Sequence, residues 1–457
     1  KYRNLCNEVI TALGKLSNFV SWNQYKALIR RYKSMLKMDS PHLKEIVLVI
    51  VNVSVSIKNS LLFLSDANCG LPSIRKFPSK LDEPKLFIAN ELYSDLTKFL
   101  NKRDDETIVA RIPLSEATVN LILGLPQDTV VSYLPGTLTS VCQVLRSRSE
   151  ELRDAVRKNL SKLAVILGAA YLSFIIKELK GALTRGSQIH VLSFSIHHVL
   201  VSLNDHLVQG DLDSSADMIA GVIMEDTFGA AGQEKDAEGY TSKMKEVKHN
   251  KSYDTAEILS NSISLEKFGS LLHPVKALLL EKLPLKVQNK LDELLRRYVL
   301  GLSKSPESAK FEVLALCHEI YQQSLGPEAY KTFRKKRTLD EKEEFFTVDL
   351  NSKFTHVETE SSLFVHTLQR LSFDLLRTSL SKNANLMDAQ YLEGFIPIFK
   401  KSLNSDDEGV LISTLRILTM IVKINFSEDN EPIFKNCARK VFNIIKDSPS
   451  TSSELCQ

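Results

Sequence analysis

The amphipathic stretch EELRDAVRKNLSKLAVILG, at residues 150–168, gives the clearest indication of the fold. Apolar side chains recur in it at intervals of three and four, the spacing that gathers them on one face of an α-helix. These positions are Leu152, Val156, Leu160, Leu163 and Leu167. Glu150 and Glu151 suit the first turn of a helix, where the backbone dipole favours negative charge, and Gly168 is typical of a helix end. The stretch therefore predicts one helix that ends at Gly168.

The same apolar spacing continues on both sides of this helix. It predicts further helices over residues 130–145, 171–183 and 188–203. Short polar turns separate them, Ser147-Arg148-Ser149 before the first helix and Arg185-Gly186 before the last. Four consecutive helices of this length form two helical hairpins in tandem, and each hairpin has about the period of a two-helix solenoid repeat.

Three prolines support a repeated unit. Pro135, Pro274 and Pro397 each appear early in an apolar helical pattern, and a second helical pattern follows each time. Proline inside a helix removes a hydrogen bond and kinks the axis. A kinked first helix before a straight second one resembles the HEAT repeat, as does the run from Asp154 to Arg157. We therefore expect an all-α chain, an α-solenoid of HEAT-like helical hairpins with polar inter-repeat loops.

Interruptions of the helical pattern divide the 457 residues into segments. We expect N-terminal hairpins over residues 1–64, a loop over 65–85, HEAT-like repeats over 86–208, a charged polar insertion over 209–263, a HEAT-like repeat and following helix over 264–325, a charged loop over 326–360, C-terminal HEAT-like repeats over 361–448 and a tail over 449–457. The chain begins with Lys1 rather than Met, so we expect a fragment of a larger protein.

Sites of chemistry are sparse in the sequence. The six cysteines form no CxxC pair, and Cys142 lies on an apolar helix face, which favours packing over reactivity. Phosphate-loop and zinc-protease motifs are missing. His190, His197 and His198 share one helix, and the sequence nearby offers only Asp205 and His206 as further metal ligands. We expect no enzyme, no cofactor, no metal and no small-molecule substrate; an enzyme hypothesis would depend on the histidine helix alone.

Membrane and nucleic-acid contacts depend on local patterns, because the net charge is only +4. Polar residues interrupt the apolar run at residues 46–64, so we expect a buried helix and no membrane contact. Basic clusters also occur on helices, at Arg30–Lys37 and Arg146–Lys158, where a solvated face is the simpler interpretation. Two basic clusters in polar segments favour contact with RNA phosphates or an acidic partner. Their residues are Lys243, Lys245, Lys248, Lys251, Arg334, Lys335, Lys336 and Arg337.

The polar stretch at residues 225–263 contains sequences that resemble one known family. Phe228-Gly229-Ala230-Ala231, Lys243-Met244-Lys245-Glu246 and the run from Lys251 to Leu259 are similar to the DRIM family of U-three small nucleolar RNA-associated proteins, and the likeness extends over about residues 130–283. These are very long HEAT-repeat proteins of the small-subunit processome. The resemblance implies a non-enzymatic scaffold in the nucleus and nucleolus.

The partners follow from the same resemblance. It implies assembly proteins of the small-subunit processome, or 90S pre-ribosome, together with precursor ribosomal RNA or U-three small nucleolar RNA, in support of precursor processing and small-subunit assembly. A HEAT-repeat scaffold or transport receptor of another large assembly stays open as the alternative. That alternative predicts a transport GTPase or signalling partner whose binding is insensitive to nuclease.

Overall fold

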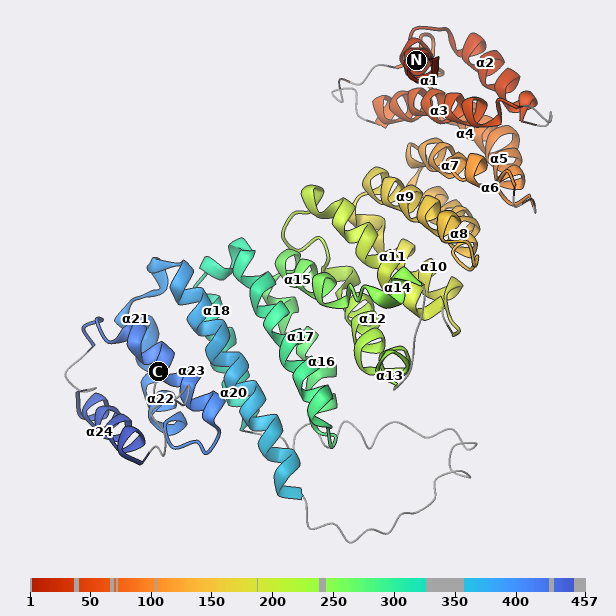
Figure 1. Ribbon diagram of the computed structural model, residues 1–457. Helices are drawn as coiled ribbons and strands as arrows, with labels where there is room; N and C mark the ends of the chain where they lie inside the picture. Colours follow the sequence, from red (N-terminus) through yellow and green to blue (C-terminus); the bar gives the residue numbers. More distant parts are fainter. Residues whose placement is uncertain are drawn as a thin grey trace. The chain divides into compact units, whose positions relative to one another are not determined.

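The computed structural model describes residues 2–36, 41–65, 70, 73–102, 104, 106–186, 188–237, 244–325, 357–426 and 431–447. These residues are almost entirely helical, and the β-type pairing among them is one isolated bridge between Ser21 and Arg75. Successive helices fold back on one another as tandem hairpins (Figure 1). The all-α, HEAT-like solenoid class predicted from the sequence is confirmed.

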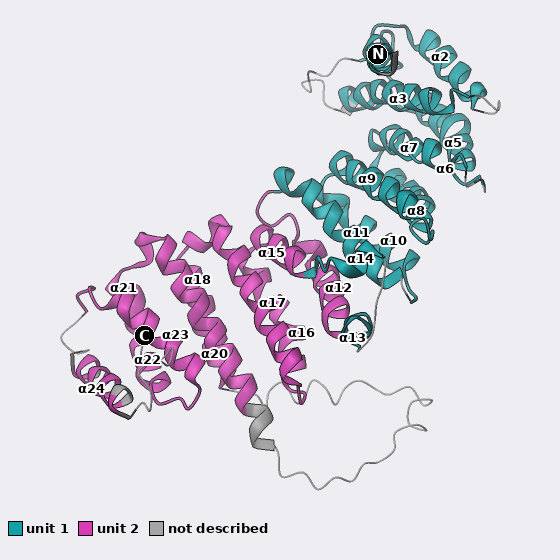
Figure 2. Ribbon diagram, viewed as in Figure 1, with its two compact units in different colours: residues 1–207, 229–252 teal, residues 208–228, 253–457 magenta. Residues whose placement is uncertain are grey.

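Two compact units make up the chain, and they are interleaved along the sequence (Figure 2). Unit 1 comprises Lys1–Leu207 and Gly229–Ser252, whereas unit 2 comprises Val208–Phe228 and Tyr253–Gln457. The segment that the sequence marks as a polar insertion is therefore shared between the two units. Its first part and its last part belong to unit 2, and its middle part returns to unit 1.

The helices of unit 1 follow the chain in order. They are α1 (Tyr2–Leu16), α2 (Trp22–Met35), α3 (Leu43–Ser65), α4 (Asp82–Leu86), the π-helical turn η2 (Phe87–Tyr93), α5 (Ser94–Leu100), α6 (Ile108–Arg111), α7 (Leu114–Leu123), α8 (Gln127–Val144), α9 (Glu150–Leu167), η3 (Ala169–Tyr171), α10 (Leu172–Ala182), α11 (Gln188–Leu203), η4 (Asn204–His206), α13 (Ala230–Asp236) and α14 (Lys245–Lys248).

In this unit, helices that occupy the same position in adjacent hairpins pack against each other. The first helices of two adjacent hairpins, α8 and α10, contact each other, and so do the second helices, α9 and α11. This two-layer stacking lets each hairpin bury its apolar face against the next one, as in a solenoid. Helix α3 packs against α1, α2 and α7. Within the described residues, α3 is the one helix long and apolar enough to cross a membrane, and 61% of its apolar window is buried in this structure.

Local sequence signals place the ends of α9 where the pattern predicts them. The Ser149 hydroxyl accepts a hydrogen bond from the backbone N–H of Leu152, which satisfies one of the free donors at the helix start. Gly168 follows the last turn with φ of 76°, a left-handed conformation that suits glycine. The described helices α8, α10 and α11 likewise match the three neighbouring predictions within a few residues.

The three prolines occupy different positions in their helices. Pro135 and Pro274 are inside α8 and α16, nearer to the middle of each helix than to its start. Pro397 is the second residue of α22, which ends at Ser402. A first-turn proline removes no helical hydrogen bond, because the N–H there has no partner within the helix. The expected early position is therefore wrong for Pro135 and Pro274, whereas Pro397 does lie early in its helix; a second helix follows each of the three.

Unit 2 continues the same architecture. Its helices are η5 (Asp213–Ser215), α12 (Ala216–Phe228), α15 (Ser252–Ser262), α16 (Leu265–Leu279), α17 (Leu285–Lys304), η6 (Pro306–Ala309), α18 (Glu312–Ser324), α20 (Val357–Lys382), η8 (Ala384–Leu386), α21 (Ala389–Leu392), η9 (Glu393–Phe395), α22 (Ile396–Ser402), α23 (Glu408–Ile421) and α24 (Glu431–Asp447). The second helices of three hairpins, α17, α20 and α23, pack in succession.

One glycine allows two of these helices to meet closely. A Cβ atom added to Gly301 on α17 would lie 1.9 Å from the Ser260 hydroxyl and 2.2 Å from the Glu257 carbonyl oxygen on α15. Neither distance is possible for a real side chain. Two salt bridges flank the contact, because Arg297 and Lys304 both pair with the Glu257 carboxylate. Only glycine at position 301 lets α15 and α17 approach this far.

Candidate nucleic-acid or partner interface

The polar segment at residues 225–263 is mostly helical where the structure describes it. It contains the end of α12, then α13, α14 and α15, and the sequence expectation of a short helix at residues 255–259 falls inside α15. The segment folds because its few apolar side chains are buried. These are Ala231, Ala256, Leu259 and Ile263.

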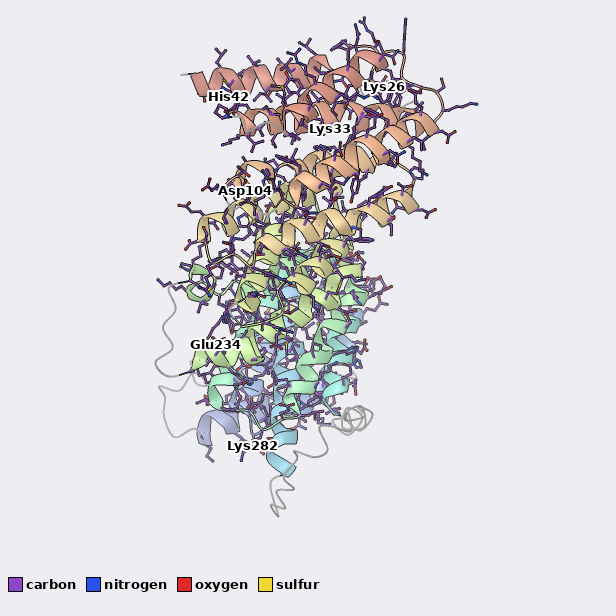
Figure 3. All side chains as sticks on the ribbon, turned by 90° about the vertical axis from the view of Figure 1, so that its right-hand side faces the viewer. Lys26, Lys33, His42, Asp104, Glu234 and Lys282 are labelled. Atoms are coloured by element: carbon purple, nitrogen blue, oxygen red, sulfur yellow. The ribbon has the colours of Figure 1, made fainter. Side chains whose placement is uncertain are left out.

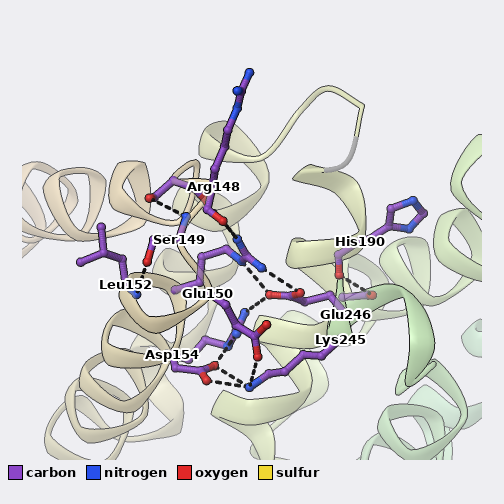
Figure 4. A network of polar contacts seen from close by, with 12 residues as sticks. Arg148, Ser149, Glu150, Leu152, Asp154, His190, Lys245 and Glu246 are labelled. Atoms are coloured by element: carbon purple, nitrogen blue, oxygen red, sulfur yellow. Dashed lines mark hydrogen bonds and ion pairs between the residues drawn. The ribbon is translucent and has the colours of Figure 1, made fainter. Parts of the chain in front are cut away.

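A buried carboxylate holds the middle of the segment against α9 in unit 1 (Figure 4). Glu246 on α14 has no exposed side-chain area, and the Arg153 and Arg157 side chains are 4% and 1% exposed. Arg153 donates from Nε to Oε1 at 2.7 Å and from Nη2 to Oε2 at 3.1 Å. Arg157 donates from Nη1 to Oε1 at 2.8 Å. Two guanidinium groups thus share one carboxylate in a water-poor site.

A second layer of charges surrounds this pair. The Asp154 carboxylate accepts from Arg157 at 2.5 Å and from Lys245 Nζ at 2.7 Å, and Glu150 lies 3.7 Å from the same ammonium. Both cations also lie over the ring of Phe194, at 5.0 Å for Arg157 and 5.8 Å for Lys245. Cations at these distances are attracted by the negative face of an aromatic ring. We call Arg153, Asp154, Arg157, Lys245 and Glu246 the Glu246 ion cluster.

The electrostatics of the cluster favour the charged state. Burial by itself would raise the pKa of Glu246, but hydrogen bonds from Arg153 and Arg157 outweigh it and lower the pKa to about 2. Burial opposes the same change at Asp154, where hydrogen bonds from Lys245 and Arg157 lower the pKa. Both carboxylates are therefore ionised at neutral pH, and the cluster is a set of matched charges.

The structure separates the candidate lysines that the sequence groups together. Lys245 is paired with Asp154 and Glu150, so its charge is balanced by carboxylates of the protein itself. Lys248 is exposed and makes no ion pair with any described residue, whereas Lys251 is half-buried. Lys243 and residues 334–337 (Arg334, Lys335, Lys336 and Arg337) lie outside the described residues.

The two helical basic clusters also divide into paired and exposed residues. On α2, Arg30 pairs with Glu91 at 2.8 Å and Lys33 with Asp95 at 2.9 Å. Lys26 on the same helix pairs with Glu83 at 2.8 Å (Figure 3 labels Lys26 and Lys33). These contacts neutralise that face of α2. The second cluster contains the two arginines that Glu246 buries, and its members Arg148 and Lys158 remain exposed.

The histidine helix α11 belongs to unit 1, and three of the described cysteines, Cys142, Cys317 and Cys437, are buried in the packing of their own units. His190 is fully buried, with Nε2 3.3 Å from a Glu234 carboxylate oxygen, and His198 contacts the Ser161 hydroxyl at 3.1 Å. In the described residues, no group of three or more His, Cys, Asp or Glu side chains could hold a metal ion. Burial raises the pKa values of Cys142 and Cys317 well above the ordinary range, which disfavours the reactive thiolate.

Sequence reasoning did not identify Glu246 as the carboxylate that accepts hydrogen bonds from Arg153 and Arg157. One signal was present: both arginines flank Val156 on the face of α9 that continues to Leu160. Cations on an apolar face require an anion, because an unpaired buried charge is costly. The pattern therefore indicated that a carboxylate was needed, although it did not indicate which one.

Tandem two-helix units stacked on one another define an all-α, helical-repeat protein of the HEAT-like solenoid class. Residues 101–321 match the family model described as the U3 small nucleolar RNA-associated protein 20 domain. Over its full length the chain is 52% identical to a protein of Saccharomyces cerevisiae and 33% identical to one of Schizosaccharomyces pombe, both named U3 small nucleolar RNA-associated protein 20. These matches confirm the resemblance to this family that the sequence predicts.

The chain covers only part of each relative, and its likeness to the solved structures is low. The chain spans 18% of the length of each of the two curated relatives. Among solved structures, an importin beta aligns with 94% of this chain and 51% of its own at 11% identity, with a TM-score of 0.33. A likeness at that score carries no weight for the fold or for function, which depend on the helices and family described above.

Proposed function

We propose that this chain is a non-enzymatic scaffold segment that acts in ribosome biogenesis in the nucleus and nucleolus. In this proposal it contacts assembly proteins of the small-subunit processome and precursor ribosomal RNA or U3 small nucleolar RNA. Through these contacts it supports precursor processing and small-subunit assembly. The observation that carries the proposal is the 52% identity, over the whole chain, to a relative named for its association with U3 small nucleolar RNA.

The architecture supports a scaffold role on physical grounds. Stacked hairpins offer a long series of helices whose outer residues can each contact a partner, while the stability comes from neighbouring repeats. Buried ion clusters such as that of Glu246 hold the polar segment in one arrangement. A surface kept in place in this manner loses little conformational freedom when it binds.

We keep part of the lysine set as proposed contacts to RNA or to an acidic partner. Lys243, Lys248 and Lys251 stay in it, together with the basic run at residues 334–337. Lys245 is left out, because its ammonium already pairs with Asp154 and Glu150. The remaining cations would give sequence-tolerant affinity that falls as salt rises, since binding releases counterions from phosphates.

In-cell crosslinking between protein and RNA, with peptides mapped by mass spectrometry, tests the proposal on the tagged full-length protein. We expect crosslinks from ribosomal precursor or U3 RNA to peptides with exposed basic residues, and co-purification of processome proteins. Absence of both would contradict the proposal. Nuclease-insensitive binding to a transport GTPase would instead support the transport-receptor alternative.

A further inference from the structure

A row of arginines crosses the second helices of three successive hairpins in unit 2. Arg296 is on α17, Arg370 and Arg377 are on α20, and Arg416 is on α23. Residues 370, 374 and 377 are spaced by four and three, which places them on one face of α20. Because α20 packs between α17 and α23, the arginines of all three helices reach a common space.

That space is a cavity of about 450 Å³, which lies in the size range of small-ligand sites. Its charged lining consists of the four arginines together with Asp292 and Asp374, and apolar side chains such as Leu295 and Leu371 complete it. Four guanidinium groups against two carboxylates leave a net charge of +2. We call this set of residues the arginine cavity.

Hydrogen-bond donors in the arginine cavity exceed the acceptors that the protein supplies. Arg370 Nη2 is 3.4 Å from Asp292 and 3.5 Å from Thr367, and Arg377 Nε is 4.0 Å from Asp374. Charge-assisted contacts are normally about 2.7–2.9 Å long. The Nε groups of Arg370 and Arg377 are buried and have no hydrogen-bond acceptor among the described residues. Arg416 is exposed, and its guanidinium group forms no hydrogen bond or ion pair with any described residue.

Arg296 differs from the other three arginines. It donates two hydrogen bonds of 2.8 Å to the Glu293 carboxylate, and this pairing satisfies much of its guanidinium group. The donors still available are therefore those of Arg370, Arg377 and Arg416. They come from two packed helices, and a guanidinium group presents up to five N–H donors in a planar fork.

The two carboxylates oppose the arginines only weakly. Burial raises the pKa of Asp374 despite the three nearby arginines, and burial raises the pKa of Asp292 despite Arg370. Burial of the two aspartates therefore outweighs the stabilisation that the nearby arginines give to their charged forms. Buried donors without acceptors cost free energy, and a bound anion would remove that cost.

We propose that the arginine cavity is a phosphate-binding site, and that Arg370, Arg377 and Arg416 there contact the backbone of a single-stranded RNA segment. The inference rests on the proposed function, from which the RNA follows. Arginine suits phosphate because its fork can donate two parallel hydrogen bonds to one phosphate group. Three guanidinium groups on two helices can contact more than one phosphate of the same strand. A free polyphosphate carries the same chemistry in a small molecule.

The test compares a triple variant with a matched control in the full chain. Arg370→Gln, Arg377→Gln and Arg416→Gln together remove the three donors. Three exposed arginines outside the cavity, Arg31, Arg185 and Arg439, provide a control with the same change of charge when replaced by Gln. Fluorescence anisotropy with a short labelled single-stranded RNA gives the affinity at several salt concentrations.

The triple variant should bind the RNA roughly tenfold more weakly or worse, and the slope of log affinity against log salt should fall by about 0.7 for each phosphate that the protein no longer neutralises. The control variant should change the slope much less. Equal reductions of affinity in the two variants would overturn the proposal. The single Arg416→Gln variant, at an exposed position, gives a smaller reduction of the same kind if the triple variant folds poorly.

A second probe separates the sources of phosphate. Inorganic tripolyphosphate should raise the melting temperature of the wild-type chain and not that of the triple variant. Stabilisation by tripolyphosphate with unchanged RNA affinity in the triple variant would overturn the RNA assignment in favour of a small polyphosphate. If the wild-type chain fails to bind RNA, the inference fails, while co-purification of processome proteins still tests the scaffold function separately.

Discussion

Arginines meet aspartate or glutamate in both units, with opposite results. In unit 1, Arg153 and Arg157 donate to Glu246 over 2.7–3.1 Å, and all three side chains are at most 4% exposed. In unit 2, Arg370 and Arg377 lie 3.4 and 4.0 Å from their nearest aspartates and are 29% and 40% exposed. Hydrogen bonds lower the pKa of Glu246, whereas burial raises the pKa of Asp374.

A basic cluster is therefore a binding candidate only after its partners within the protein are known. Glu246 and Asp154 accept hydrogen bonds from both terminal nitrogens of Arg157, and Glu246 accepts two from Arg153, so the Glu246 ion cluster serves the fold even though Arg157 Nε has no acceptor among the described residues. No described carboxylate closes on Arg370 and Arg377 in the same way, so their donors remain available to a ligand. The predictions below test the two halves of this comparison.

The largest effect should come from removing the central carboxylate of unit 1. Glu246→Ala leaves two buried guanidinium groups without their main partner, and breaking a buried pair in this manner costs roughly 3–5 kcal/mol. We expect the free energy of unfolding of unit 1 to fall by about that amount, measured by denaturant unfolding with hydrogen exchange to localise the destabilised helices. Glu8→Ala, at an exposed glutamate of α1, is the control and should change stability by less than about 0.5 kcal/mol. Equal destabilisation of the two variants would contradict the interpretation that Glu246 pairs with Arg153 and Arg157 in a buried site.

Acid should open the Glu246 ion cluster. The folded-state pKa of Glu246 is about 2, below its ordinary value of 4.5, so its stabilising effect is present above pH 4.5 and disappears as the pH falls toward 2. The difference corresponds to about 3 kcal/mol at about 1.36 kcal/mol per pKa unit. Unfolding measured between those pH values should show this decrease in the wild type and a smaller one in Glu246→Gln. Superimposable acid profiles would exclude Glu246 as the titrating group.

Two neighbouring lysines should separate a structural cation from a binding cation. Lys245→Ala removes the ion pairs to Asp154 and should destabilise unit 1 by about 1 kcal/mol, with little change in the salt dependence of RNA binding. Lys248→Ala should leave stability within about 0.5 kcal/mol and lower the salt slope by about 0.7. Parallel melting and RNA-binding measurements check both, and a reversed pattern would return Lys245 to the contact set.

A substitution in the arginine cavity should have only a small effect on stability. Asp374→Asn removes a carboxylate whose charged form is disfavoured there, so the free energy of unfolding should change by less than about 1 kcal/mol. Affinity for a phosphate ligand should rise severalfold, because the cavity no longer holds a repelling charge. Titration with labelled RNA measures the increase, and weaker binding would show that Asp374 positions the arginines.

Local chemistry explains what the sequence could predict. The helix at residues 150–167, its end at Gly168 and the three helices around it follow from apolar spacing and from turn residues that act within a few positions. The resemblance to the family follows from short sequence motifs in the polar segment. These features need no knowledge of distant partners.

Distant partners explain what the sequence could not predict. Glu246 lies 93 residues after Arg153, and no periodic pattern connects them. The pattern predicts Pro135 and Pro274 too early in their helices, because a proline is also tolerated inside a helix that other contacts hold. Arg370, Asp374 and Arg377 did share a helical spacing, but their convergence with Arg416 depends on how α20 packs against α23.

The interleaving of the two units has a consequence for the order in which the chain folds during synthesis. Unit 1 lacks α14 until residue 248 has been made, yet residues 208–228 of unit 2 are synthesised before that point. Arg153 and Arg157 therefore leave the ribosome long before Glu246 is available to cover them. A recombinant boundary at residue 207 would reproduce that unfinished state, whereas a boundary after residue 252 would include the carboxylate.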